Sequence, residues 1–178
     1  MSTTKSLGFK GLDLRESYDS GDLAQNIVLD FFEPALSEAI SYNRIAGYFN
    51  SGMLAACARG MATFISSSAK MRLICSPELS AEDIARLESL SGDHGRSHQV
   101  FEDALARGIG DIDYLEDLLE RHHIEAMAWM ISKNRLDIRI AVPNDLNARE
   151  QLFHQKRGVL EDIHGNRLAF SGSINETR

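Results

Sequence analysis

The last 26 residues of the chain, FHQKRGVLEDIHGNRLAFSGSINETR, gather side chains that can act on a phosphate group. His154 and Lys156 lie two residues apart, and so do Ser173 and Asn175. A lysine ammonium and an asparagine amide can donate hydrogen bonds to the non-bridging oxygens of a phosphodiester. A histidine can attack phosphorus as a neutral imidazole or protonate the leaving oxygen as an imidazolium. The combination indicates phosphoryl-transfer chemistry.

These four residues are expected on the two strands of a β-hairpin. A turn centred on residues 164–165 would place His154 opposite Asn175 and Lys156 opposite Ser173, so that all four converge on one face. A register shifted by one residue would instead distribute them over both faces. An ordinary hairpin with a solvated polar face is the alternative, and the H-x-K element alone is too short to decide between them.

The complete pattern, FHQKRGVLEDIHGNRLAFSGSINET, resembles the H-x-K … G-S-x-N signature of the phospholipase D superfamily. More narrowly, it is similar to the phospholipase D-like nuclease domains at the N-terminus of bacterial DEAD/DEAH-type helicases. The similarity continues upstream in YNRIAGYFNSGMLAACARGMATFI, KMRLICSPELSAEDI and IEAMAWMISKNRLDIRIAVP, and covers most of residues 20–178. The resemblance implies that His154 is the nucleophile or the acid, and that Lys156, Ser173 and Asn175 bind phosphate.

The acidic position of the motif departs from the family pattern. The family has an aspartate seven residues after the histidine, whereas this chain has Glu161 there, followed by Asp162. The hairpin is also longer than the shortest versions of the motif. Glu161 is therefore a possible supporting residue, and the other four assignments are unaffected.

The implied mechanism requires two histidines, one to form a phosphohistidine and one to protonate the leaving group. The chain has a single H-x-K, and none of its other histidines begins a second copy. We therefore expect a homodimer that contributes one His154 from each subunit. The family pattern also continues beyond G-S-x-N with a strand and an acidic residue. We expect a fragment of a longer protein with a helicase motor on the full-length chain, although no Walker-type G-K-[ST] sequence occurs here.

The charge distribution is uneven. The net charge is −7, yet residues 131–178 contain eight basic and six acidic residues, so that third carries +2 and the remainder −9. A phosphate-bearing ligand is expected near the C-terminal third. We expect a metal-independent nuclease without a cofactor, acting on DNA. The alternatives are a non-catalytic DNA-binding module of a helicase and a phosphatidyl-transferring enzyme.

The sequence also indicates the cellular setting. No run of apolar residues approaches the roughly 20 needed to cross a membrane, and the first residues lack the pattern of a secretory signal. The two cysteines, Cys57 and Cys75, lie within apolar segments and are expected to be buried free thiols. We expect a cytoplasmic protein with no membrane partner.

Hydrophobic periodicity predicts an α/β fold. Residues 1–17 are expected as a loose N-terminal arm, and residues 18–178 as one phospholipase D-like domain with a mixed sheet flanked by helices. Helices are expected over 23–40, with an interruption at Pro34, and over 51–67, 80–90, 99–108 and 111–134. Strands are expected over 42–50, 70–77 and 135–143, followed by the closing hairpin.

Other polar residues are explained more simply. His94 and His98 have the spacing of two metal ligands, but a turn-rich loop without an obvious third ligand is the better interpretation. His122 and His123 are expected at a helix surface. Trp129 is expected in the core rather than as a platform for bases.

Overall fold

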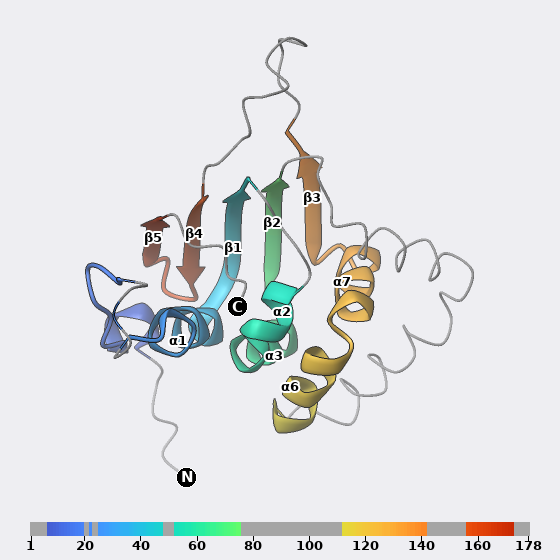
Figure 1. Cartoon of the computed structure of the whole chain (residues 1–178), viewed down its shortest axis with the longest axis horizontal. Coiled ribbons are helices and arrows are strands. Elements are labelled where there is room, and N and C mark those ends of the chain that lie inside the picture. The colour runs from blue at the N-terminus through green and yellow to red at the C-terminus, as the bar shows by residue number, and fades with distance from the viewer. Residues whose placement is uncertain are drawn as a thin grey trace.

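A computed structural model of the chain describes residues 7–19, 22, 25–47, 52–75, 112–141 and 156–172. These residues form a five-stranded mixed sheet with helices packed against it, ending in a β-hairpin (Figure 1). The predicted α/β class, the mixed sheet and the closing hairpin are therefore confirmed. Within the described ranges no helix is long and apolar enough to cross a membrane.

The sheet has the strand order β3-β2-β1-β4-β5. The strands are β1 (Ala39–Ala46), β2 (Lys70–Cys75), β3 (Leu136–Ile140), β4 (Lys156–Asp162) and β5 (Arg167–Ser171). The first three strands run parallel to one another, and β4 runs antiparallel to both β1 and β5. As a result β1, β2, β3 and β5 end at the edge of the sheet where β4 begins (Figure 1). We call this edge the carboxyl edge.

The helical segments largely follow the predicted ranges. They are η1 (Gly8–Gly11), η2 (Val28–Phe32), α1 (Glu33–Glu38), α2 (Gly52–Ala56), α3 (Ala58–Ser66), α6 (Ile112–Arg121) and α7 (His123–Ser132). The π-helical turn η2 passes directly into α1, and Pro34 occupies the first turn of α1, where its missing N–H is not needed. The helix predicted over 23–40 thus stops at Glu38, and β1 begins three residues earlier than expected. The helices predicted over 80–90 and 99–108 lie outside the described residues.

The two faces of the sheet differ in burial. On β2, Met71, Leu73 and Cys75 are buried against the helices, whereas Lys70 and Ile74 are exposed on the opposite side. This alternation is the one expected for a sheet with a single covered face. We call the two sides the helix face and the open face. The predicted burial of both free cysteines and of Trp129 is confirmed.

Between β4 and β5, Asn166 still pairs with Asp162, and the loop that this pair closes consists of the three residues 163–165. The Asp162 N–H donates to the carbonyl of Asn166, and the Gly165 N–H donates to the carbonyl of Asp162, both at 3.0 Å. Gly165 has φ of 76°, a left-handed conformation that glycine adopts without the strain of a Cβ. This arrangement is typical of a three-residue hairpin loop, in which the last residue forms a bulge.

The length of this loop sets the register of the hairpin. Gly158 lies opposite Phe170, and the carbonyl of Lys156 accepts a hydrogen bond from the Gly172 N–H at 3.0 Å. The predicted pairing of Lys156 with Ser173 was therefore wrong by one residue. That prediction assumed a turn centred on residues 164–165, whereas the chain forms a loop with an odd number of residues.

The carboxylate of Asp162 holds this loop and the N-terminal segment together. It accepts hydrogen bonds from the backbone N–H groups of Phe9 (2.8 Å), His164 (2.9 Å) and Asn166 (2.9 Å), and from the Asn166 side chain (2.9 Å). Burial opposes ionisation, but the hydrogen bonds outweigh it and lower the pKa of Asp162 to about 2. Phe9, in the segment expected as a loose arm, is buried and docked on the hairpin.

Replacing Asp162 by Asn should lower the free energy of unfolding by about 1–3 kcal/mol at pH 7, because an amide cannot accept all of these hydrogen bonds. The pKa of Asp162 lies below its ordinary value of 3.8, so its contribution is complete above about pH 4 and is lost as the pH falls toward about 2. The difference between wild type and variant should shrink over the same range. Urea denaturation at several pH values measures both effects.

The matched control is Glu161→Gln on the neighbouring residue, whose ion pair with Arg167 lies at the surface. This change should alter stability by less than about 0.5 kcal/mol. Equal effects of the two substitutions at pH 7 would contradict the role assigned to Asp162.

Candidate functional site

Lys156 is the first residue of β4 and lies at the carboxyl edge. Its side chain belongs to the helix face, because Gly158, Leu160 and Asp162 at alternate positions of the same strand are buried there. In open α/β sheets, ligands commonly bind beyond the carboxyl ends of the parallel strands. The position of Lys156 is therefore suitable for contact with a ligand.

The immediate neighbours of Lys156 are small. Ala46 of β1 pairs with it on one side, and Gly172 follows β5 on the other. A cavity of about 420 Å³ opens at this point, and Lys156, Tyr18, Phe170 and other residues line it. Small side chains on both sides leave the space around the Lys156 ammonium unfilled.

Arg44 of β1 lines the same cavity. It lies on the helix face in the row next to Lys156, opposite Gly158, and only 3% of its surface is exposed. Its guanidinium carbon lies 4.9 Å from the centre of the Phe170 ring, a distance at which a cation is attracted to the face of an aromatic ring. Two cationic side chains therefore contribute to one cavity at the carboxyl edge.

Gly158 makes the contact between Arg44 and Phe170 possible. The three residues form one row across β1, β4 and β5. A Cβ added to Gly158 would lie 2.3 Å from an edge atom of the Phe170 ring and 3.1 Å from the ring of Tyr42. Only glycine at this position lets the Phe170 ring lie across β4 and reach Arg44.

Other aromatic rings hold Phe170 in place. The centre of its ring lies 5.4 Å from that of Phe31 and 5.3 Å from that of Phe32, with edge-to-face geometry in both pairs. Tyr18 extends the cluster through an edge contact with Phe31 at 5.7 Å. Such contacts add about 0.5–1.5 kcal/mol each beyond simple burial. One wall of the cavity is therefore rigid and aromatic.

The charges around the cavity are mixed. Arg15, Arg44 and Lys156 supply three cationic groups, and Glu16 and Asp19 supply two carboxylates. The two cations on the strands lie together at the sheet, whereas the other three charges belong to the N-terminal segment. An anionic group is therefore best accommodated against β1 and β4.

The two acidic residues of the motif have different surroundings. Glu161 lies on the open face and forms an ion pair with Arg167 at 2.8 Å, away from the cavity beside Lys156. Asp162 is the buried residue and organises the hairpin loop. Sequence reasoning named Glu161 as the possible supporting residue and missed the structural role of Asp162. The signal was present in the neighbouring H-G-N sequence, which is typical of a loop that an aspartate caps.

His154, Ser173 and Asn175 lie outside the described residues, so their convergence with Lys156 stays a prediction. The observed register adds a condition to it. An unbroken ladder would place Ser173 opposite Gln155, on the face away from Lys156. The four groups can therefore meet only if the strands leave this ladder beyond Lys156 and Gly172.

The remaining histidines add no residue to the candidate site within the described part of the chain. His94 and His98 are also outside the described residues. His122 is exposed, with its Nδ1 atom 3.9 Å from the carboxylate of Glu125, and His123 is half-buried at the start of α7. Among the residues that the structure describes, no group of three or more His, Cys, Asp or Glu side chains is arranged to hold a metal ion.

The chain matches no family model, no curated protein and no solved structure. The resemblance to phospholipase D-like domains therefore rests on the motif residues and on the upstream segments quoted above. The fold and the cavity provide separate, purely physical grounds on which a function can be proposed.

Replacing Gly158 by Ala should lower the free energy of unfolding by about 1–3 kcal/mol, because the added methyl group overlaps the Phe170 ring. The loss should be much smaller when Phe170 has already been changed to Ala. Urea denaturation of the two single variants and the double variant gives the coupling energy, which we expect to exceed about 1 kcal/mol. Additive effects would show that Gly158 does not act through Phe170.

Proposed function

We propose that the chain is the phospholipase D-like part of a metal-independent nuclease that cleaves DNA through a phosphohistidine intermediate. The observation that carries this proposal is the placement of Lys156 beside Arg44 in one cavity at the carboxyl edge. Two cations at this place would stabilise the charge that develops on the oxygens of a five-coordinate phosphorus. The wider motif, H-x-K … G-S-x-N, supplies the remaining groups.

The reaction has two steps. In the first, a neutral His154 imidazole forms a bond to phosphorus while the P–O bond to the leaving group breaks, and a second imidazolium gives its proton to the departing oxygen. In the second, that imidazole takes a proton from water, the resulting hydroxide attacks phosphorus, and the N–P bond breaks. Lys156 binds the non-bridging oxygens in both steps, and Ser173 and Asn175 join it in a hairpin whose strands leave the ladder beyond Gly172.

The second imidazole comes from His154 of a second copy of the chain. A two-fold axis through the site would bring the two residues together. The two imidazoles must begin in different protonation states, as in other acid/base pairs. The scheme therefore requires a dimer with one shared site.

DNA is the proposed substrate because the motif is similar to helicase-linked nuclease domains. We propose that the complete protein also carries a helicase motor and acts in DNA processing or defence. A binding module without catalysis is the main alternative, and it would retain affinity for DNA without cleaving it. A phosphatidyl-transferring enzyme would cleave phosphatidylcholine in vesicles in preference to oligonucleotides.

The direct test is cleavage of a fluorescent oligonucleotide by the full-length protein in EDTA. We expect the rate to be unchanged by the chelator, and Lys156→Ala to lower kcat about 100-fold or more while the fold is retained. Lys10→Ala, which removes an exposed lysine elsewhere, is the matched control and should have little effect. Loss of cleavage in EDTA with recovery in Mg²⁺ would show that the proposed chemistry is wrong.

Mixing experiments test the shared site. When equal amounts of wild-type protein and His154→Ala variant exchange subunits, about a quarter of the dimers are fully wild type. Each wild-type subunit then has an even chance of an inactive partner, so activity per wild-type subunit should fall to about half. Native mass spectrometry verifies the exchange. Unchanged activity after complete exchange would contradict a site built from two copies.

A further inference from the structure

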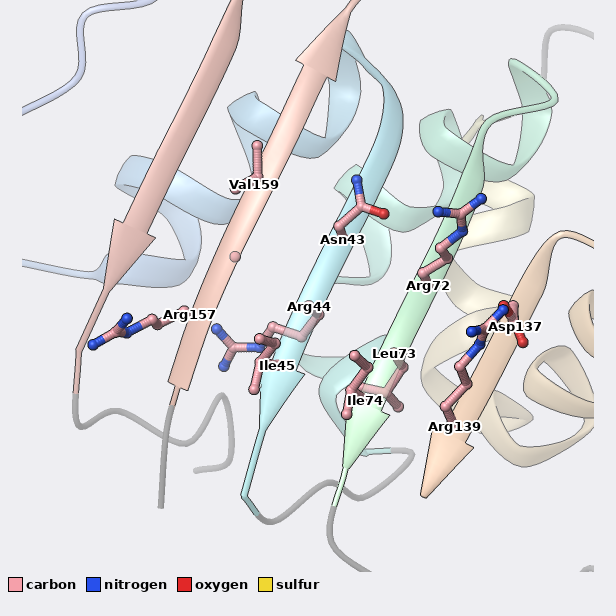
Figure 2. Close-up of a pocket in the computed structure, with 11 residues that line it drawn as sticks. Asn43, Arg44, Ile45, Arg72, Leu73, Ile74, Asp137, Arg139, Arg157 and Val159 are labelled. Atoms are coloured by element: carbon pink, nitrogen blue, oxygen red, sulfur yellow. The ribbon is translucent and has the colours of Figure 1, made fainter. Parts of the chain in front are cut away.

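The open face of the sheet carries basic side chains on neighbouring strands. Figure 2 looks onto this face, with Arg72 on β2, Arg139 on β3 and Arg157 on β4, and with the helices behind the sheet. Lys70 and Arg167 lie on the same face, at alternate positions of their strands. A chain with a net charge of −7 thus presents a basic surface on the face of the sheet where these side chains are exposed.

The acidic residues of the open face are paired there. Asp137 contacts Arg139 at 3.2 Å, and Glu161 contacts Arg167 at 2.8 Å. Within the part of the chain that the structure describes, Arg72 and Arg157 form no ion pair. Among the described residues, the open face therefore holds two guanidinium groups that form no ion pair, and Asp137 is the carboxylate that lies opposite one of them, Arg72.

The outer helix layer has the opposite character. On α6, Asp113, Glu116 and Asp117 lie close together, and two arginines, Arg59 and Arg121, pair with them. Glu120 adds an exposed carboxylate to the same helix. The uneven charge would orient a polyanion toward the open face and away from the helices.

Apolar side chains lie between the arginines. The row nearest the carboxyl edge contains Arg157, Ile45, Ile74 and Arg139, on β4, β1, β2 and β3 respectively. Ile74 and, in the adjacent row, Val159 are each 37% exposed. These residues line a shallow hollow of about 310 Å³ (Figure 2). The hollow thus has an apolar floor and sides that carry three arginines of the open face and one carboxylate, that of Asp137.

We propose that the open face binds single-stranded nucleic acid that flanks the phosphate at Lys156, an inference that rests on the proposed nuclease function. Phosphates contact Arg72, Arg139 and Arg157, and unpaired bases lie against Ile45 and Ile74. Three strand spacings separate Arg157 from Arg139, about 14 Å in all.

The path to the catalytic cavity is short. Arg157 and Lys156 are consecutive residues of β4 whose side chains lie on opposite faces, both at the carboxyl edge. A strand that crosses the open face and passes around this edge arrives at Lys156. A single strand fits better than a duplex, because only unpaired bases expose faces that can contact an apolar floor or stack on a guanidinium plane.

The test compares two double variants of equal charge. Arg72→Gln with Arg157→Gln removes both unpaired arginines of the open face, and Arg59→Gln with Arg121→Gln removes two arginines of the helix layer. Affinity for a fluorescent 20-nucleotide oligothymidine is measured by anisotropy between 50 and 300 mM KCl. We expect the first variant to bind at least about tenfold more weakly, with the salt slope reduced by about 1.4. The second should bind like wild type.

Further measurements separate the possible outcomes. Changing Arg72 and Arg157 to Lys should restore the salt slope, which a merely unfolded variant would not do. Bis(4-nitrophenyl) phosphate is small enough to reach the cavity without spanning the open face. In the Gln double variant of the open face, kcat/KM should therefore fall at least about tenfold more for the oligonucleotide than for this small substrate. Wild-type affinity in the Gln double variant of the open face would overturn the proposal. It would also be overturned if sedimentation showed that this variant had lost its dimer while the salt slope of binding stayed unchanged. If the wild-type protein binds oligonucleotide with the predicted slopes but hydrolyses neither substrate, the nuclease function fails and the binding face stands.

Discussion

The hydrogen bonds to the Asp162 carboxylate determine the register of the hairpin and, through that register, the surroundings of Lys156. They hold a three-residue loop, the loop sets the register of β4 with β5, and the register places Phe170 opposite Gly158. The same register puts Gly172 beside Lys156, which leaves the space that becomes the cavity. The surroundings of Lys156 therefore depend on a buried carboxylate at the other end of the same strand.

Alternation along the strands gives the sheet two unlike surfaces. The helix face of β1 and β4 combines Arg44 and Lys156 with an aromatic wall, whereas the open face combines arginines with aliphatic side chains. Neither surface requires a separate structural element, because the side chains of consecutive strand residues such as Lys156 and Arg157 point to opposite faces of the sheet. The edge of a single sheet can in this way join the proposed phosphate site to the proposed surface for a longer polyanion.

The elements of the fold follow from local patterns, and most of them could be predicted. The alternation of KMRLIC identifies a strand with one covered face, and Pro34 marks the start of a new helical segment. The hairpin register could not be predicted correctly, since it depends on whether the loop has two residues or three. Arg44 also escaped prediction. Its closeness to Lys156 arises from pairing between segments more than 100 residues apart, which no local spacing reveals.

The three-residue loop also bears on how such a chain can change over evolutionary time. Because successive residues of a strand face opposite sides, a change of loop length that shifted the pairing of β5 with β4 by one residue would turn every side chain of β5 to the other face of the sheet. Phe170 would then leave the helix face, while many substitutions at the exposed Ile163 or His164 would leave the register intact. In this hairpin, conservation of loop length is a stricter requirement than conservation of the residues at its tip.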